Sequence, residues 1–332
     1  LVTALKGGRP ARPVFFEFVV ASEHLRRIPG VRFTDDPTPE GRLRDWIEGY
    51  RVAGFDFATI PVWDVGLFSF PSIHRDHMAS VGMARGGIIY DRASFEAYPW
   101  PDAEQGDWPM LERVGNDLPD GMKLIALSNG GVLENAISLV GYEDLCYLIA
   151  DDPGLTKEVF DAIGSRILRL YERMLDRPWI GAAFVNDDWG FRSQGFLPPD
   201  AMREYVFPWT KRIIETIRKA GKPSILHSCG NLETLWDDIL DDLCPDAKHS
   251  YEDTILPVEN AYERFVEKMG VVGGIDLDFL CRSEPAAIRK RCEAMLERTE
   301  SRGGYALGSG NSIPAYIPFE SFMAMRDVAL SR

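Results

Sequence analysis

Long apolar segments are absent from this chain of 332 residues. A transmembrane helix needs roughly 20 consecutive apolar residues, and no run approaches that length. The first residues are apolar, but Lys6, Arg9 and Arg12 interrupt them before the core of a secretory signal can form. We therefore expect a cytoplasmic protein that does not act in a membrane.

Positive charge is scarce. Lysine and arginine total 37 against 51 aspartates and glutamates, which gives a formal net charge of -14. A protein that binds nucleic acid needs a clustered basic surface, so this class of partner is excluded. The Gly-x-Gly-x-x-Gly fingerprint of dinucleotide-binding folds is also missing, because Gly308-Ser-Gly is too short to supply it.

Cysteines are few, odd in number and scattered along the chain. The five are Cys146, Cys229, Cys244, Cys281 and Cys292. This distribution does not indicate a disulfide framework.

Short apolar runs alternate with amphipathic stretches along the whole chain. The apolar runs predict eight strands, at Val14–Val20, Phe55–Val62, Met122–Ser128, Gly181–Asn186, Pro223–Ser228, Ala247–Ser250, Val271–Ile275 and Tyr305–Gly308. Helices are predicted at Glu40–Ala53, Leu155–Leu175, Pro199–Ala220, Leu232–Leu243, Val258–Met269, Glu284–Glu300 and Phe319–Ala329. This alternation is typical of a single α/β domain over residues 1–332, a (β/α)8 TIM barrel with its active site at the carboxyl ends of the strands.

One region does not follow the alternation of predicted strands and helices. Residues 64–121 form a long insertion rich in glycine, proline and aromatic residues. It is either an excursion that packs outside the barrel or a lid over the strand ends.

His227 and Cys229 close the fifth apolar run. Side chains alternate along a strand, so both point to one face, and Asn231 can cap the helix that follows. An imidazole and a thiol together supply half of a zinc site, although packing is the commoner role of such a pair. His249 is expected to be a hydrogen-bonded strand-end histidine, and His24, His74 and His77 to lie on the surface or in loops.

Further polar residues fall at predicted strand ends. Asp187 and Asp188 follow the fourth run, and because their side chains alternate, only one is expected to face the barrel mouth. Both could instead solvate a loop. The remaining candidates for a ligand pocket are Glu17, Trp189, Glu252, Asp276 and Asn311.

The order of several motifs resembles the uroporphyrinogen decarboxylase-like superfamily. The motifs are Asn-Asp-Asp-Trp-Gly (186–190), Leu-Pro-Pro-Asp (197–200) with Phe-Pro-Trp (207–209), Leu-His-Ser-Cys-Gly-Asn (226–231), Gly-Gly-Ile-Asp (273–276) and Gly-Tyr-Ala-Leu-Gly-Ser-Gly-Asn-Ser-Ile-Pro (304–314). The resemblance covers about Pro13 to Met325, and it implies a (β/α)8 barrel independently of the strand pattern.

This superfamily contains decarboxylases and methyltransferases that depend on zinc and a corrinoid. The decarboxylases carry an arginine-rich N-terminal segment that binds substrate carboxylates, whereas the corresponding segment here, Phe16 to His24, has no arginine. The methyltransferases carry His-x-Cys-Gly, whose His and Cys bind zinc with a second cysteine near the C-terminal Ile-Pro. Asn311 stands near that position, so the resemblance implies His227 and Cys229 as ligands and leaves the third open. Either Glu17, Asp187, Glu252 or Asp276 completes the site, or the metal is lost.

The resemblance implies a methyltransferase that moves a methyl group between a small substrate and a corrinoid protein, with zinc as Lewis acid. Asp187 or Asp188 would position substrate or act as acid or base. The corrinoid is expected on a separate protein, because Ile225 stands where the cobalamin-binding pattern Asp-x-His-x-x-Gly requires aspartate. The alternatives are a metal-free decarboxylase or lyase on the same barrel and a non-catalytic binder of a small ligand.

Overall fold

A computed structural model describes residues 1–71 and 86–331. Within this part, seven parallel strands form one sheet in chain order. They are β1 (Phe57–Thr59), β2 (Lys123–Ala126), β3 (Ile180–Asn186), β4 (Ser224–His227), β5 (Ala247–His249), β6 (Gly270–Val272) and β7 (Tyr305–Ala306). Seven of the eight predicted strands are therefore confirmed, each shorter than or close to its apolar run.

The first predicted strand is the exception. Residues 14–20 make isolated parallel bridges, Phe15 with Leu307 and Val20 with Ile313, and no regular strand. On the side facing β1, a side chain replaces a backbone partner, because the Thr59 hydroxyl donates to the Phe18 carbonyl at 3.0 Å. The expectation of eight regular strands is therefore wrong. The fold is a curled, seven-stranded parallel sheet like that of a TIM barrel, and residues 14–20 lie between its edge strands.

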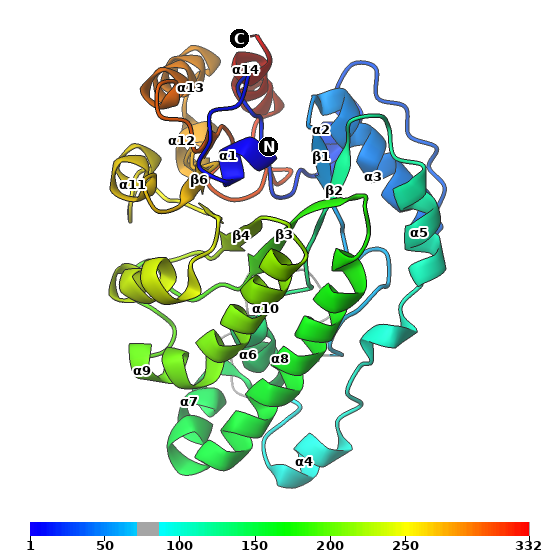
Figure 1. Cartoon of the computed structure of the whole chain (residues 1–332), viewed down its shortest axis with the longest axis vertical. Helices are drawn as coiled ribbons and strands as arrows, with labels where there is room; N and C mark the ends of the chain where they lie inside the picture. Colours follow the sequence, from blue (N-terminus) through cyan, green and yellow to red (C-terminus); the bar gives the residue numbers. More distant parts are fainter. Residues whose placement is uncertain (72–85, 332) are drawn as a thin grey trace.

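Helices connect the strands and cover the sheet (Figure 1). Those of at least one α-helical turn are α1 (Val2–Leu5), α2 (Ser22–Arg27), α3 (Pro39–Ala53), α4 (Arg92–Ala97), α5 (Trp108–Asn116), α6 (Val132–Val140), α7 (Tyr142–Asp151), α8 (Pro153–Leu175), α10 (Phe207–Lys219), α11 (Val258–Phe265), α12 (Leu277–Arg282), α13 (Pro285–Thr299) and α14 (Phe319–Leu330). The other helical elements are the three-residue turns α9 (Pro199–Ala201), η1 (Ala103–Gln105) and η3 (Glu233–Leu235) and the π-type turns η2 (Met202–Val206) and η4 (Asp238–Leu243). No helix in the described ranges is both long and apolar enough to cross a bilayer.

Two predicted helices are irregular. The one over residues 199–220 contains the π-type turn η2 directly before Pro208, since proline has no N–H and its ring collides with the preceding turn. The one over residues 232–243 is not α-helical and consists of η3 and η4. The N-cap position is taken by Leu232 rather than by Asn231 as expected, although the Asn231 side-chain oxygen accepts the Glu233 N–H at 3.0 Å.

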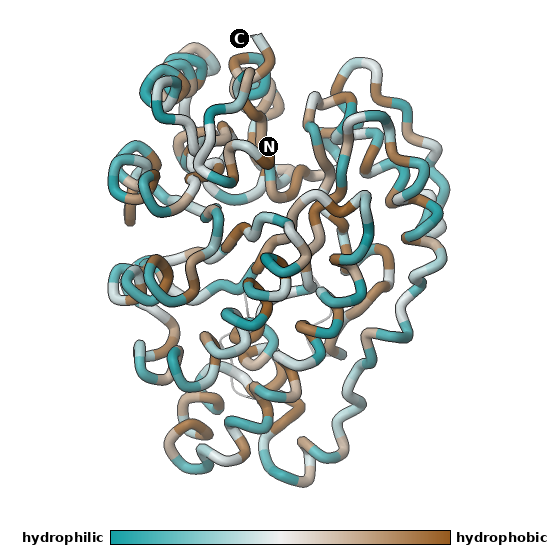
Figure 2. The backbone as a smooth tube through the Cα atoms, in the orientation of Figure 1, coloured by the Kyte–Doolittle hydropathy of each residue, from teal (hydrophilic) through white to brown (hydrophobic). Residues whose placement is uncertain are grey.

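Apolar side chains from the helices and the sheet form a continuous core, and apolar and polar positions alternate along the tube in Figure 2. The packing of α8 on α10 illustrates how tight this core is. A Cβ at Gly164 in α8 would lie 2.2 Å from the Trp209 ring of α10, so only glycine allows the two helices to approach.

The described parts of the insertion pack outside the sheet. Gly87 and Ile89 donate backbone hydrogen bonds to carbonyls at the end of α6, and Arg166 of α8 donates to the Pro101 carbonyl at 3.1 Å. His74 and His77 lie outside the described residues.

Candidate metal centre

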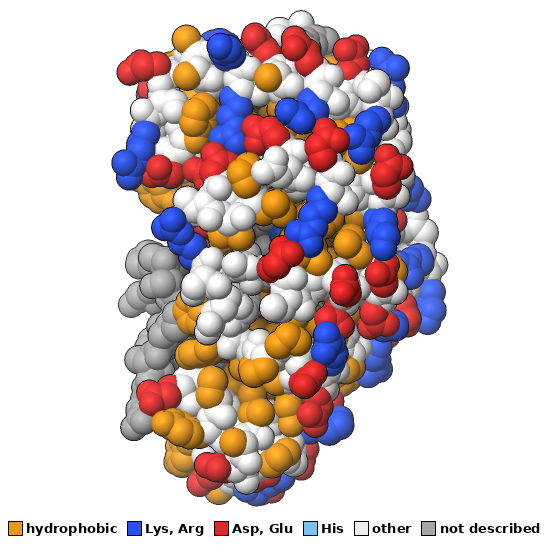
Figure 3. Space-filling model, turned by 90° about the vertical axis from the view of Figure 1, so that its left-hand side faces the viewer, with side chains coloured by type: hydrophobic (Ala, Val, Ile, Leu, Met, Phe, Trp, Pro, Cys, Tyr) orange, Lys and Arg blue, Asp and Glu red, His pale blue; other side chains and the backbone are white. Residues whose placement is uncertain are grey.

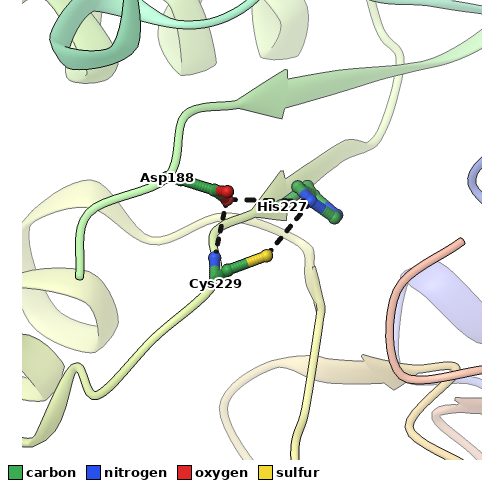
Figure 4. A group of neighbouring side chains, drawn as sticks. All are labelled: Asp188, His227 and Cys229. Carbon is green, nitrogen blue, oxygen red and sulfur yellow. Dashed lines mark hydrogen bonds and ion pairs between the residues drawn. The ribbon is translucent and has the colours of Figure 1, made fainter. Parts of the chain in front are cut away.

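Three side chains converge at the carboxyl ends of β3 and β4 (Figure 4). His227 is the last residue of β4, and Asp188 and Cys229 lie just beyond β3 and β4. The His227 Nε2 atom lies 3.7 Å from the Cys229 Sγ atom and 3.8 Å from an Asp188 carboxylate oxygen. All three ligand atoms lie within 4.8 Å of one another. The predicted convergence of His227 and Cys229 is therefore present.

The centre is buried on one side and open on the other. The His227 side chain is 7% exposed, and its ring stacks on Phe18 with the centroids 4.3 Å apart. Burial lowers the pKa of His227 well below its usual value, with a smaller contribution from His249, so the ring is neutral at pH 7. The Asp188 side chain is 33% exposed, so solvent and small molecules reach the centre from its side.

Hydrogen bonds orient the Cys229 sulfur. Sγ accepts from the Ser250 hydroxyl and from the Asn311 amide, each at 3.2 Å, and the Cys229 N–H donates to Asp188 at 2.9 Å. Burial raises the pKa of the Cys229 thiol well above 9, and the charge of Asp188 adds to the shift. The thiol therefore stays protonated near neutral pH unless a cation takes the place of its proton.

A buried lysine holds the segment that carries Ser250. The Lys248 ammonium donates to the carbonyls of Ser228, His249 and Ser250 at 3.1, 3.1 and 2.7 Å. Ser250 has a φ of 81°, a left-handed conformation that costs energy for a residue other than glycine. Burial lowers the pKa of Lys248 to about 8. Lys248 thus compensates the strain that aims the Ser250 hydroxyl at Cys229.

The three side chains match the chemistry and spacing of a zinc site. In a tetrahedral zinc site, nitrogen and sulfur ligands lie about 3.5 Å apart and nitrogen and oxygen about 3.4 Å apart, from the usual bond lengths. The two observed separations from the His227 Nε2 atom, 3.7 and 3.8 Å, exceed these values by only a few tenths of an ångström, and the sulfur and the carboxylate oxygen lie within 4.8 Å of each other. Three protein ligands with an open fourth position are typical of catalytic rather than structural zinc.

The comparisons with known proteins agree with the motifs. The sequence profile of uroporphyrinogen decarboxylase (URO-D) matches residues 108–331. The chain belongs to the URO-D family. A uroporphyrinogen decarboxylase from Anaeromyxobacter dehalogenans (strain 2CP-C) is 28% identical over 195 residues, which cover 56% of this chain and 51% of that protein. The match therefore spans about half the length of this relative.

A solved structure extends the likeness in fold to the whole chain. A methyltransferase from Methanosarcina mazei superposes with a TM-score of 0.76 at 15% identity, covering 99% of this chain and 97% of that one. At this identity the likeness establishes the fold and not the activity. The superfamily predicted from the motifs is confirmed.

In this URO-D family member, the third group at the centre is Asp188. The four residues predicted to complete a zinc site lie elsewhere. Asp187 accepts the N–H groups of Leu133 and Glu134 at 3.0 and 2.9 Å and so caps α6, and burial raises its pKa to about 6. Asp276 caps α12 by accepting the Phe279 N–H at 2.9 Å.

The other two acids are also held away from the three ligand atoms. Glu17 is fully buried and accepts the N–H and hydroxyl of Ser309 at 2.8 and 2.6 Å. Burial raises the pKa of Glu17 to about 8, so it carries a proton at pH 7. Glu252 lines a neighbouring cavity of about 200 Å³ together with Lys248 and Ser250, and burial raises its pKa.

Trp189 and His24 both lie deeper in the molecule than the sequence predicts. Trp189 was predicted to line a pocket, but it is fully buried and packs against Phe207 with the ring centroids 5.3 Å apart. His24 was predicted at the surface, yet it is 2% exposed, because its Nε2 atom pairs with the Pro314 carbonyl at 3.1 Å. A paired imidazole can be buried like an apolar ring.

The sequence reasoning overlooked Lys248, Ser250 and Glu134. Glu134 is packed beside Asp187 and Asp188, and burial together with their charges raises its pKa well above the usual value. Gly130 and Gly131, directly before α6, could have indicated that this segment approaches the end of β3 closely. A Cβ at Gly131 would lie 2.1 Å from Asp187.

Proposed function

We propose that this URO-D family member is a zinc-assisted methyltransferase that moves a methyl group between a small substrate and a corrinoid protein. The observation that carries the proposal is the convergence of Asp188, His227 and Cys229 at the open end of the sheet. The methyltransferase from Methanosarcina mazei shares the fold and is compatible with this activity.

Each residue at the centre has a separate role in this proposal. Asp188, His227 and Cys229 would hold the metal. Zinc supplies a Lewis acid that stabilises a substrate thiolate or polarises a methoxy oxygen. Ser250 and Asn311 orient the Cys229 sulfur through their hydrogen bonds. Asn311 occupies the side of Cys229 where the resemblance implied a second cysteine, and because it donates rather than ligates, a position stays open for substrate.

A second candidate is decarboxylation, which the relative from Anaeromyxobacter dehalogenans favours. The N-terminal segment argues against it. Where the decarboxylases are expected to place arginines for substrate carboxylates, this chain has Phe18, whose ring stacks on His227, and Glu17, which is buried on Ser309. An anionic porphyrinogen would meet no arginine from this segment.

The corrinoid remains assigned to a partner protein. Ile225, in the middle of β4, stands where the sequence pattern for binding cobalamin would need aspartate, and it is fully buried. The small substrate would approach from the side of Asp188, which is partly exposed. A cavity lined by Glu252 and Ser250 lies next to the centre.

Metal content tests the proposal directly. The purified protein should contain about one zinc per chain, and Cys229→Ala should lose it, because the thiolate is a main ligand. Cys146→Ala is the matched control, since Cys146 is an exposed cysteine on α7. A wild-type protein that neither contains nor binds zinc would refute the metal-assisted mechanism.

Turnover separates the two candidates. Zinc-loaded protein is mixed with methylcobalamin and a panel of small thiols, and loss of the cobalt–carbon bond is followed by absorbance. Transfer that requires Cys229 and Asp188 supports the proposal. Release of carbon dioxide from a porphyrinogen by zinc-free protein, without methyl transfer, would favour the decarboxylase instead.

A further inference from the structure

Two histidine rings meet behind the metal centre. The Nδ1 atoms of His227 and His249 lie 2.8 Å apart, the distance of a hydrogen bond. Two nitrogens this close cannot both carry a hydrogen, so one ring donates and the other accepts. The register of β4 and β5 creates this contact, because His227 and His249 are paired directly across the two strands.

The hydrogen bond on the other side of the His249 ring determines which of the two histidines is the donor. Its Nε2 atom lies 3.2 Å from the Ser309 carbonyl oxygen, which can only accept, so Nε2 carries the hydrogen. Both rings are buried, where a charged imidazole is costly, so each carries a single ring hydrogen. The Nδ1 atom of His249 is therefore an acceptor, and the Nδ1–H of His227 donates to it.

This leaves a lone pair on the Nε2 atom of His227. That atom is the one that lies 3.7 Å from the Cys229 sulfur and 3.8 Å from Asp188. A neutral imidazole binds a metal through the nitrogen that lacks a hydrogen. The hydrogen-bond chain therefore presents the correct atom to the centre.

Further hydrogen bonds fix Ser309, the last residue in the series of hydrogen bonds that runs from His227 through His249. Its N–H and hydroxyl are bound to Glu17, and its carbonyl also accepts the Gly274 N–H at 2.8 Å. Gly273 leaves the space for the bond to His249, because a Cβ there would lie 2.2 Å from the Ser309 oxygen and 2.9 Å from the His249 Nε2 atom.

We propose that His249 is a positioning residue that fixes the tautomer of His227, so that the Nε2 lone pair faces Asp188 and Cys229. The inference rests on the proposed zinc site and adds to it the group that prepares one ligand before metal arrives. An outer hydrogen-bond partner of this kind typically contributes 10–100-fold to metal affinity.

Nitrogen NMR of the metal-free protein tests the tautomer without any assumption about activity. The chain has five histidines, and His227→Asn identifies the signals of His227 by their loss. We expect the His227 Nδ1 to be protonated and its Nε2 to be unprotonated. A His227 that carries its hydrogen on Nε2 would overturn the proposal.

Two variants separate the hydrogen bond from the loss of the ring. His249→Asn keeps an acceptor where Nδ1 stood, whereas His249→Leu removes it, and both lose the bond to Ser309. We expect His249→Leu to lose the single tautomer of His227 and 10–100-fold of zinc affinity, measured by competition with a chelator. His249→Asn should keep the tautomer and lose less than tenfold.

The outcomes distinguish this inference from the proposed function. Equal tautomer and zinc affinity in wild type and His249→Leu would refute the role of His249. If wild type binds no zinc but shows the expected tautomer, the zinc site fails while the positioning by His249 stands. If His249→Leu does not fold, the spectra of wild type and His249→Asn still decide the tautomer.

Discussion

Single residues at the carboxyl ends of the strands are held by groups that lie far away in the sequence. Glu17 illustrates this, because its partner Ser309 is 292 positions away. The carboxyl group is completely buried, and its hydrogen bonds to Ser309 only partly offset the cost of burying a charge, so the native state keeps it protonated up to about pH 8. The unfolded chain releases this proton near its ordinary pKa of 4.5.

Glu17 should therefore make stability fall as pH rises. Between about pH 5 and pH 8 the native state binds one more proton at this site than the unfolded state, which destabilises the fold by up to about 1.4 kcal/mol per pH unit. Glu17→Gln is neutral at all pH values, and its amide oxygen can accept the Ser309 N–H while its amide N–H donates to the Ser309 hydroxyl. We expect urea unfolding at several pH values to show wild type losing stability relative to Glu17→Gln across this window. Parallel profiles would contradict the assignment.

At the scale of the elements, the end of β3 gives two neighbouring acids different tasks. Asp187 turns toward the start of α6 and accepts two of its N–H groups, while Asp188 turns toward His227 and Cys229. The alternation of side chains predicted that only one acid would face the centre. Which of the two does so depends on the position of α6, which the local sequence does not specify.

A matched pair of variants tests this division. Asp187→Asn can accept only one of the two N–H groups and should lose about 1–3 kcal/mol of stability while keeping zinc. Asp188→Asn should keep the unfolding midpoint within a few degrees and lose most zinc affinity, because an amide is a poor zinc ligand. Thermal unfolding and metal titration are measured on both. Loss of zinc in Asp187→Asn and not in Asp188→Asn would reverse the two roles.

At the scale of the whole molecule, residues 14–20 lie between the edge strands of the sheet and contact residues around the centre. Residues 14–20 contact the segment that follows β7, and we call this contact the seam. Gly308 is its tightest point, because a Cβ there would lie 1.8 Å from the Phe16 carbonyl oxygen. The same seam places Phe18 on His227 and Glu17 on Ser309. Stability and the metal centre are therefore coupled here.

Gly308→Ala should destabilise the protein by about 2–4 kcal/mol and weaken zinc binding together, since backbone must move to admit the methyl group. Gly154→Ala, near the start of α8, is the control, because its Cβ would meet only ordinary van der Waals contact, and alanine favours a helix. Chemical unfolding and zinc affinity are compared for the two variants. A Gly308→Ala protein as stable as wild type would show that the seam tolerates displacement.

The surface of the molecule agrees with the composition. Figure 3 shows acidic and basic side chains interspersed over the upper part of one face, with apolar side chains gathered lower down. Ion pairs such as Lys268 with Asp241 at 2.6 Å and Arg264 with Glu233 at 2.8 Å join charges of opposite sign. The net charge of -14 still predicts that nucleic acid is not a partner.

Local patterns by themselves determined seven of the strands, most of the longer helices between them, and the convergence of His227 with Cys229. Apolar periodicity and strand alternation act within a few residues, so they can be read without a structure. The motifs also identified the URO-D family.

Only the tertiary structure decided which acid joins the centre, which acids merely cap helices, and how His249 and Ser309 orient His227. These choices depend on register between strands and on close approaches such as those at Gly131 and Gly273. Residues 14–20 do not form the predicted strand for the same reason, because the Thr59 hydroxyl, from another part of the chain, donates to the Phe18 carbonyl. A sequence specifies such long-range contacts only through the packing of the whole molecule.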